Sequence, residues 1–97
     1  MPKNFVIIRT ARAGVFMGYL ESENEATRTV ILRNARRIWY WSGAASLSQL
    51  AVGGTSDPKN CKFPAPVKRC KLFEVLEILE TTELARTNLE AVPEWKV

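Results

Sequence analysis

Residues 35–54 read ARRIWYWSGAASLSQLAVGG and decide the fold, because they lead the chain out of a strand-rich half and into a helix. Residues 36–41 contain the aromatic and β-branched side chains that strands favour, so an extended segment is predicted there. Beyond Trp41 no charged residue occurs before Asp57, and apolar residues recur at helical spacing at positions 44, 47, 50 and 51. A short helix is therefore predicted, with Ser42 as its N-cap and the glycine pair 53–54 as its end.

Side-chain alternation along an extended segment assigns the aromatic residues of this block to two faces. Ile38 and Tyr40 are expected on one face. Arg37, Trp39 and Trp41 are expected on the other. At least one of the two tryptophans should therefore lie away from the side on which Ile38 is buried.

Three strands are predicted before the block. Phe5–Ile8 and Val15–Leu20 are short apolar runs on either side of a turn at Gly14, so they predict a hairpin. Thr27–Leu32 is a third run rich in β-branched residues, and a bend is predicted at residues 34–35.

The segment Val67–Leu79 is the most ambiguous part of the chain. A loop is predicted over residues 55–66, where Pro64 and Pro66 enforce an extended path towards this segment. The apolar residues of Val67–Leu79 fit neither the helical nor the strand period well. Strands at Val67–Leu72 and Val75–Leu79 with a kink between them are predicted, and one continuous helix is the alternative.

A second helix is predicted near the C-terminus. Thr81 or Thr82 is the expected cap, Glu83 suits the positive end of the helix dipole, and Pro93 ends the helix. Trp95 is expected to pack back on the body of the protein. Residues 1–97 are thus predicted to form one α+β domain: an antiparallel sheet of about five strands, one short central helix and one C-terminal helix.

The net charge of +4 hides an asymmetry along the chain. From residue 72 to the end, six glutamates face two cations. Between residues 33 and 71, in contrast, Asp57 is the lone acidic residue against eight cations: Arg33, Arg36, Arg37, Lys59, Lys62, Lys68, Arg69 and Lys71. This asymmetry favours an anionic partner at the basic part, or head-to-tail pairing between copies of the protein.

The composition argues against several classes of protein. No apolar run approaches the roughly 20 residues that span a bilayer, and the N-terminus lacks a signal peptide pattern, so a cytoplasmic protein without membrane contact is expected. Cys61 and Cys70 are expected to remain reduced thiols there, and without histidine they do not complete a zinc site. No cofactor motif occurs, and no nucleophile has an evident base, so we expect no enzyme.

The strongest candidate site combines the paired arginines, the aromatic residues and the polar residues of the expected helix. Guanidinium groups bind phosphates bidentately, aromatic faces stack on nucleobases, and short polar side chains hydrogen-bond sugars. Core packing of the tryptophans and simple solvation of the Gly14 loop are the alternative interpretations. The predicted ligand-binding residues are Arg9, Arg12, Arg36, Arg37, Trp39, Tyr40, Trp41, Ser42, Ser46, Ser48 and Gln49.

The run LRNARRIWYWSGAASLSQLA at residues 32–51 resembles a signature of small proteins of unknown function encoded by tailed bacteriophages and prophages. Further similar pieces are VIIRT (6–10), AGVF (13–16), GYLE (18–21), CKFP (61–64), EIL (77–79) and the ending VPEW (92–95). The resemblance covers nearly the whole chain and brings no catalytic residues with it. It implies an accessory protein that inhibits a host enzyme, binds nucleic acid or sequesters a nucleotide immune signal, and the last class tends to be small and oligomeric.

The site and the resemblance together predict a homo-oligomer that binds an anionic, nucleotide-derived small molecule, such as an immune second messenger, without cleaving it. Arginines would hold the phosphates, Trp39 or Trp41 would stack on the base, and the polar residues would orient the sugar. A nucleic-acid-binding protein and an inhibitor of a host protein are the alternatives.

Overall fold

The computed structural model describes residues 4–97, and within them the element order is the one predicted. The two helices and the single 3₁₀ turn lie between or after the strands. The elements are β1 (Phe5–Thr10), β2 (Val15–Asn24), β3 (Thr29–Arg37), α1 (Leu47–Gly53), η1 (Pro58–Asn60), β4 (Val67–Leu72), β5 (Val75–Glu80) and α2 (Glu83–Glu90). The α+β prediction is confirmed, and the ambiguous segment 67–79 forms two strands rather than a helix.

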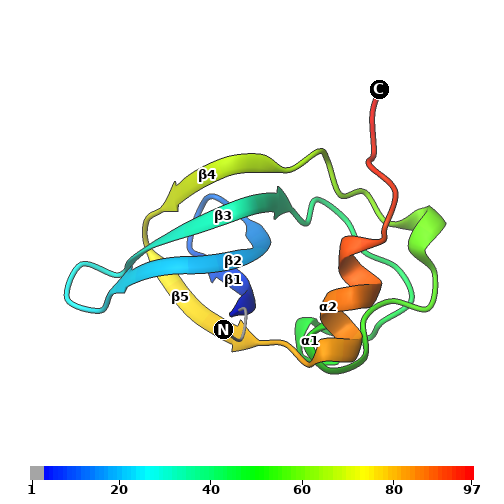
Figure 1. The fold of residues 1–97 in the computed structure, drawn as a ribbon, viewed down its shortest axis with the longest axis horizontal. Helices are drawn as coiled ribbons and strands as arrows, with labels where there is room; N and C mark the ends of the chain where they lie inside the picture. Colours follow the sequence, from blue (N-terminus) through cyan, green and yellow to red (C-terminus); the bar gives the residue numbers. More distant parts are fainter. Residues whose placement is uncertain (1–3) are drawn as a thin grey trace.

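All five strands form one antiparallel sheet in the order β4-β3-β2-β1-β5. The edge strands β4 and β5 are nevertheless consecutive in the chain, joined by Phe73 and Glu74 alone. In a flat sheet the two edges would be about 19 Å apart, which is further than this link reaches. The sheet therefore curls until its edges meet at the link, as Figure 1 shows. The Val75 N–H donates to the carbonyl of Arg28 at 3.0 Å and ties this corner to the β2–β3 hairpin.

The curl gives the sheet an inner and an outer face, each with its own hydrophobic core. Strand β1 is an interior strand, flanked by β2 and β5, and it is buried on both faces, which explains its unbroken apolar run. On the inner face, residues of four strands form the enclosed core: Val6, Ile8, Phe16, Val30, Leu32, Ala35 and Leu72.

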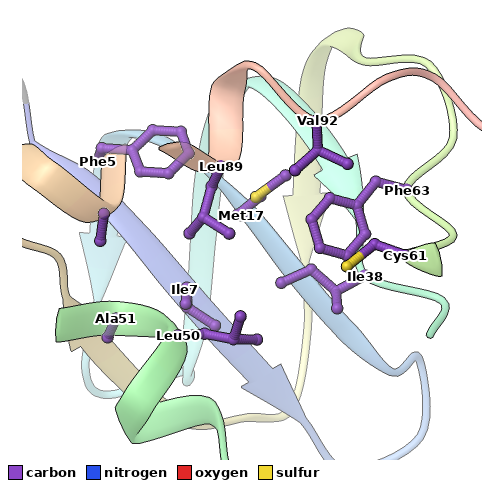
Figure 2. Packing of buried hydrophobic residues seen from close by; sticks show 11 residues of the cluster. Phe5, Ile7, Met17, Ile38, Leu50, Ala51, Cys61, Phe63, Leu89 and Val92 are labelled. Carbon is purple, nitrogen blue, oxygen red and sulfur yellow. The ribbon is translucent and has the colours of Figure 1, made fainter. Parts of the chain in front are cut away.

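The outer face of β1 and β2 packs against both helices and the long connection between β3 and β4. Helix α1 contacts β1, β5 and α2. Figure 2 shows this helix-covered core, in which the connection contributes its own buried side chains beside those of the helices. The core consists of Phe5, Ile7, Met17, Ile38, Leu50, Ala51, Cys61, Phe63, Ala85, Leu89 and Val92.

A β-bulge interrupts β3 at the position where the sequence predicts a bend. Met17 pairs with Arg36 and Tyr19 with Arg33, so β3 has one residue more than β2 across this interval. Asn34 adopts φ 51°, the left-handed conformation that asparagine tolerates best after glycine. The extra residue shifts the alternation, so that the inner face takes the residue three positions after Leu32 instead of two or four.

Both helices begin at side-chain caps. The N-H of Ala85 donates to the Thr82 hydroxyl at 3.0 Å, which confirms one of the two caps expected for α2. The prediction that Ser42 caps α1 is wrong, because the helix starts five residues later and Ser46 is its N-cap. Ser46 accepts from the N–H of Gln49 at 3.2 Å, and the Gln49 side chain accepts from the N–H of Ala45 at 2.9 Å. The sequence Ser-Leu-Ser-Gln has the spacing of a capping box, which is the signal that identifies this cap.

Candidate functional site

Arg36 was expected to bind a phosphate, but it is a buried structural residue. Its side chain is only 7% exposed and points from β3 into the body of the protein. Nε donates to the carbonyl of Pro64 at 2.9 Å and Nη1 to that of Val92 at 2.9 Å. Nη2 donates to the carbonyls of Phe63 at 2.7 Å and Pro93 at 3.4 Å. Arg36 therefore joins the strand to two distant segments, and four of its N–H groups are already engaged.

Burial sets the electrostatics of this residue. It lowers the pKa of Arg36, and the charge of Glu94 acts in the opposite direction. The guanidinium is cationic at any working pH, and neutral carbonyls solvate it in place of water. Its hydrogen bonds favour a fixed structural role over contact with a ligand.

The other three predicted arginines also have partners within the chain. Arg9 donates from Nε to Glu77 at 2.9 Å. Arg12 makes a bidentate contact with Glu74, which lowers the pKa of that carboxyl. Arg37 donates to the carbonyl of Ala13, and its guanidinium carbon lies 4.3 Å from the ring centroid of Phe16. These contacts join β1 to β5, the β1–β2 turn to the β4–β5 link, and β3 to the β1–β2 turn.

The three consecutive aromatic residues lie in different environments. Trp39 is 64% exposed and Tyr40 is 52% exposed, whereas Trp41 packs against the helix-covered core and donates from Nε1 to the carbonyl of Ala44 at 3.2 Å. The expectation that one tryptophan lies away from the buried Ile38 is confirmed. The assignment of Tyr40 to the buried face is wrong, because β3 ends at Arg37 and strict alternation ends with it.

The predicted polar residues mostly organise their own loop. Ser42 donates to Asp57 Oδ2 at 3.0 Å, and the hydrogen bonds from Asn60 and then from Ser42 lower the pKa of that carboxyl. Ser46 and Gln49 are engaged in the cap of α1, and Ser48 is exposed on the first turn of the helix. The block therefore does not present these residues together with the arginines.

The exposed aromatic residues gather around a lysine that lies outside the block. Nζ of Lys62 is 5.8 Å from the ring centroid of Tyr40 and 5.6 Å from that of Trp95. Trp95 is 36% exposed, so both rings are open to solvent beside a cation. We call Tyr40, Lys62 and Trp95 the aromatic cluster.

Three short segments, distant in sequence, build the aromatic cluster. Tyr40 and Lys62 form an isolated antiparallel bridge, and the N–H of Lys62 donates to the Tyr40 carbonyl at 2.8 Å. Phe63 and Glu94 form a parallel bridge, and the N–H of Trp95 donates to the Phe63 carbonyl at 3.0 Å. Trp95 thus packs back on the body as expected. Neither bridge has a signal in the sequence, which is why Lys62 and Trp95 were absent from the predicted site.

Four hollows on the surface do not coincide with the predicted site. Of all the predicted ligand-binding residues, Arg36 alone lines any of them, in a hollow of about 540 Å³ beside Glu90 and Glu94. The largest, of about 690 Å³, is lined by Arg33, Lys68 and Arg69. In the described part of the chain, residues 4–97, no three acidic, cysteine or histidine side chains gather as a metal site.

The sequence matches the model of a family described as a domain of unknown function, DUF6948, over residues 3–89, and the chain belongs to that family. No curated protein and no solved structure gives a match. Tyr40 and Lys62 lie inside the matched range, and Trp95 lies beyond it. Neither helix of residues 4–97 has the length and apolar character needed to cross a membrane.

Proposed function

We propose that this member of the DUF6948 family is a non-catalytic binding protein that holds a nucleotide-derived small molecule against its aromatic cluster. The observation that carries the proposal is the placement of one ammonium group between two exposed rings, 5.8 Å and 5.6 Å from their centroids. Aromatic faces stack on nucleobases with a gain of about 1–3 kcal/mol per base. The cation beside them suits the phosphate that a nucleotide carries.

The roles differ from those expected for the block alone. Tyr40 and Trp95 take the stacking role, and Lys62 takes the phosphate in place of Arg36. Trp39 is 64% exposed one residue before Tyr40 and offers a further ring at the margin of the cluster. A single lysine accompanies the two rings, which suits a small ligand better than the row of phosphates in a nucleic acid.

The exposure of the aromatic cluster affects which oligomeric state could enclose a bound ligand. Small-molecule sites bury about 70–90% of their ligand, whereas these side chains lie on an exposed surface. We therefore include in the proposal a second copy of the chain that covers the bound ligand, so that the active form is a homo-oligomer. In this proposal the protein acts in the cytoplasm of a phage-infected bacterium and removes an immune second messenger from solution without cleaving it.

The test is native mass spectrometry of the full chain, alone and after incubation with cyclic mononucleotides, cyclic dinucleotides and ADP-ribose. The expected result is a discrete adduct, one per subunit or per dimer, whose mass equals that of the intact ligand. An unmodified mass with every compound, from protein that retains its fold by circular dichroism, would overturn the proposal and favour a host-protein target.

Variants connect any adduct to the aromatic cluster. Tyr40→Ala and Trp95→Ala should each raise the Kd by about 5- to 150-fold, the loss expected from one stacking contact. Phe73→Ala is the matched control, because Phe73 is 59% exposed and Nζ of Lys71 lies 5.4 Å from its ring centroid elsewhere on the surface. Equal Kd values for all three variants and the parent chain would contradict the assignment.

A further inference from the structure

A second surface of the molecule has the chemistry of an anion site and shares no residue with the aromatic cluster. It lies on the face of β3 and β4 that the helices leave open, and Figure 1 shows β4 well separated from α1 and α2. The hollow of about 690 Å³ on this face is called the arginine hollow below. It is lined by Asn4, Tyr19, Leu20, Arg33, Asn34, Lys68 and Arg69.

Strand register brings two like charges together in the arginine hollow. Arg33 of β3 and Arg69 of β4 are direct cross-strand partners, so their side chains share a face. Like charges in this position repel each other and destabilise the pair of strands. Such a pair persists where an anion lies between the two guanidinium groups.

Glu21 supplies part of that negative charge. It is the extra residue of a bulge in β2, between the pairs that Leu20 and Ser22 form with β3. Arg69 donates to its carboxylate from Nη2 at 2.8 Å and from Nε at 3.2 Å, and Nε of Arg33 lies 3.3 Å from Oε1. The hydrogen bond from Arg69 is the main reason that the pKa of Glu21 lies below its ordinary value.

The carboxylate of Glu21 neutralises one of the three cations that line the arginine hollow, which are Arg33, Lys68 and Arg69. Nε of Arg33 lies 3.3 Å from Oε1 of this carboxylate, and within residues 4–97 the two terminal nitrogens of Arg33 make no hydrogen bond. Asn34 and Lys68 line the same hollow, and within residues 4–97 neither side chain makes a hydrogen bond. Tyr19 closes one side, with its hydroxyl donating to Glu90 at 2.6 Å. Two cationic residues, Arg33 and Lys68, therefore line one hollow and have donors that no residue of the described chain engages.

We propose that the arginine hollow is a phosphate-binding site, in which the terminal nitrogens of Arg33 and the ammonium of Lys68 hold the anion while Arg69 stays on Glu21. Guanidinium groups offer paired N–H donors that match two phosphate oxygens. The phosphate belongs either to a free phosphorylated compound or to a nucleic-acid backbone, and both present the same oxygens to the site. The inference does not rest on the proposed function of the aromatic cluster.

The test is an NMR titration of the full chain with pyrophosphate, followed through backbone amides and the Asn34 side-chain amide. Saturable shifts are expected at residues 33, 34, 68 and 69. Arg33→Gln and Lys68→Gln should each raise the Kd by about tenfold or more, because each removes a charge-assisted contact. Lys71→Gln removes the same charge from the same strand outside the hollow and should change the Kd little.

Glu21→Gln gives a result of opposite sign. It removes the carboxylate that competes with phosphate for the two guanidinium groups, so pyrophosphate should bind more tightly. Chemical shifts that do not saturate with pyrophosphate, or an equal loss of affinity in Lys68→Gln and Lys71→Gln, would mean that net charge alone attracts the anion. Either result would overturn the proposed site.

A titration with a single-stranded oligonucleotide separates the two sources of phosphate. Shifts at the same residues, with a slope of log K against log salt of about −0.7 for each phosphate engaged, identify a nucleic-acid backbone. Shifts with pyrophosphate alone identify a free phosphorylated compound. Tyr40→Ala and Trp95→Ala should leave pyrophosphate binding unchanged, so failure of this site and failure of the aromatic cluster are distinguishable.

Discussion

Arg33 and Arg36 lie on one strand, three residues apart, and do opposite work. Arg36 is 7% exposed and donates to the backbone carbonyls of residues 63, 64, 92 and 93. The Arg33 side chain is 61% exposed and touches one shared carboxylate. Asn34 lies between them as the extra residue of the bulge, so the two arginines have different surroundings on the outer face of the sheet. The contrast teaches that position relative to a bulge, rather than residue type, decides which arginine is buried in the fold and which remains mostly exposed.

The largest break in this comparison is expected from Arg36→Ala. Its removal leaves four carbonyls without their donor in a buried region, which should lower the free energy of unfolding by about 3–5 kcal/mol. Urea denaturation followed by circular dichroism measures the loss, with Arg33→Ala as the matched control on the same strand. Equal urea midpoints for the two variants would mean that Arg36 is not the structural member of the pair.

A smaller effect is expected from Gly18→Ala, which acts on the bulge itself. A Cβ at this position would lie 3.0 Å from the carbonyl oxygen of Arg33 and 3.1 Å from Cα of Ala35, so the backbone of β3 would have to shift. We expect a loss of about 1–3 kcal/mol, typical of overpacking. Gly53→Ala is the control, since a Cβ there meets nothing within 4 Å, and thermal unfolding of both variants gives the comparison.

The smallest effect is a difference in pH dependence. The pKa of Glu21 is lowered in the folded protein, so its ion pairs stabilise the fold above the ordinary carboxyl value of about 4.5 and are lost as the pH falls through the depressed pKa. Glu21→Gln should therefore lower stability at pH 7, and this deficit should shrink as the pH falls below about 4.5. The carbonyl partners of Arg36 do not titrate, so its contribution should persist at both values. Urea midpoints at pH 7 and pH 3 measure this, and a Glu21→Gln deficit that is the same at both would contradict it.

Much of the fold could be predicted from local sequence because its signals are local. The apolar run of β1, the threonine cap of α2 and the break at residues 73–74 each depend on a few neighbouring side chains. The start of α1 was missed although its capping box is equally local. Ser42 also carries a side-chain acceptor within reach of N–H groups two or three residues on, but its hydroxyl is bonded to Asp57 instead.

The site was harder to predict because its geometry depends on pairings between distant segments. The aromatic cluster exists because residue 63 pairs with residue 94 and residue 40 with residue 62. The fate of Arg36 depends on carbonyls 27 to 57 positions away in the chain. Composition indicated aromatic residues beside cations as the notable chemistry. It did not indicate which cations, because arginines in a basic block look alike until the register is known.

The interior position of β1, between β2 and β5, also governs how the chain acquires its structure during synthesis. Its first neighbour, β2, follows directly in the chain. Its second neighbour is β5, so Arg9 bonds to Glu77, which lies 68 residues further along the chain. Because synthesis proceeds at about 5–20 residues per second, one edge of β1 stays unpaired for several seconds. Pairings of such long range slow folding, so the curled sheet should close only after nearly the whole chain has left the ribosome. Until then the most apolar strand of the protein has one edge open to other chains, which makes the nascent chain the form most exposed to aggregation.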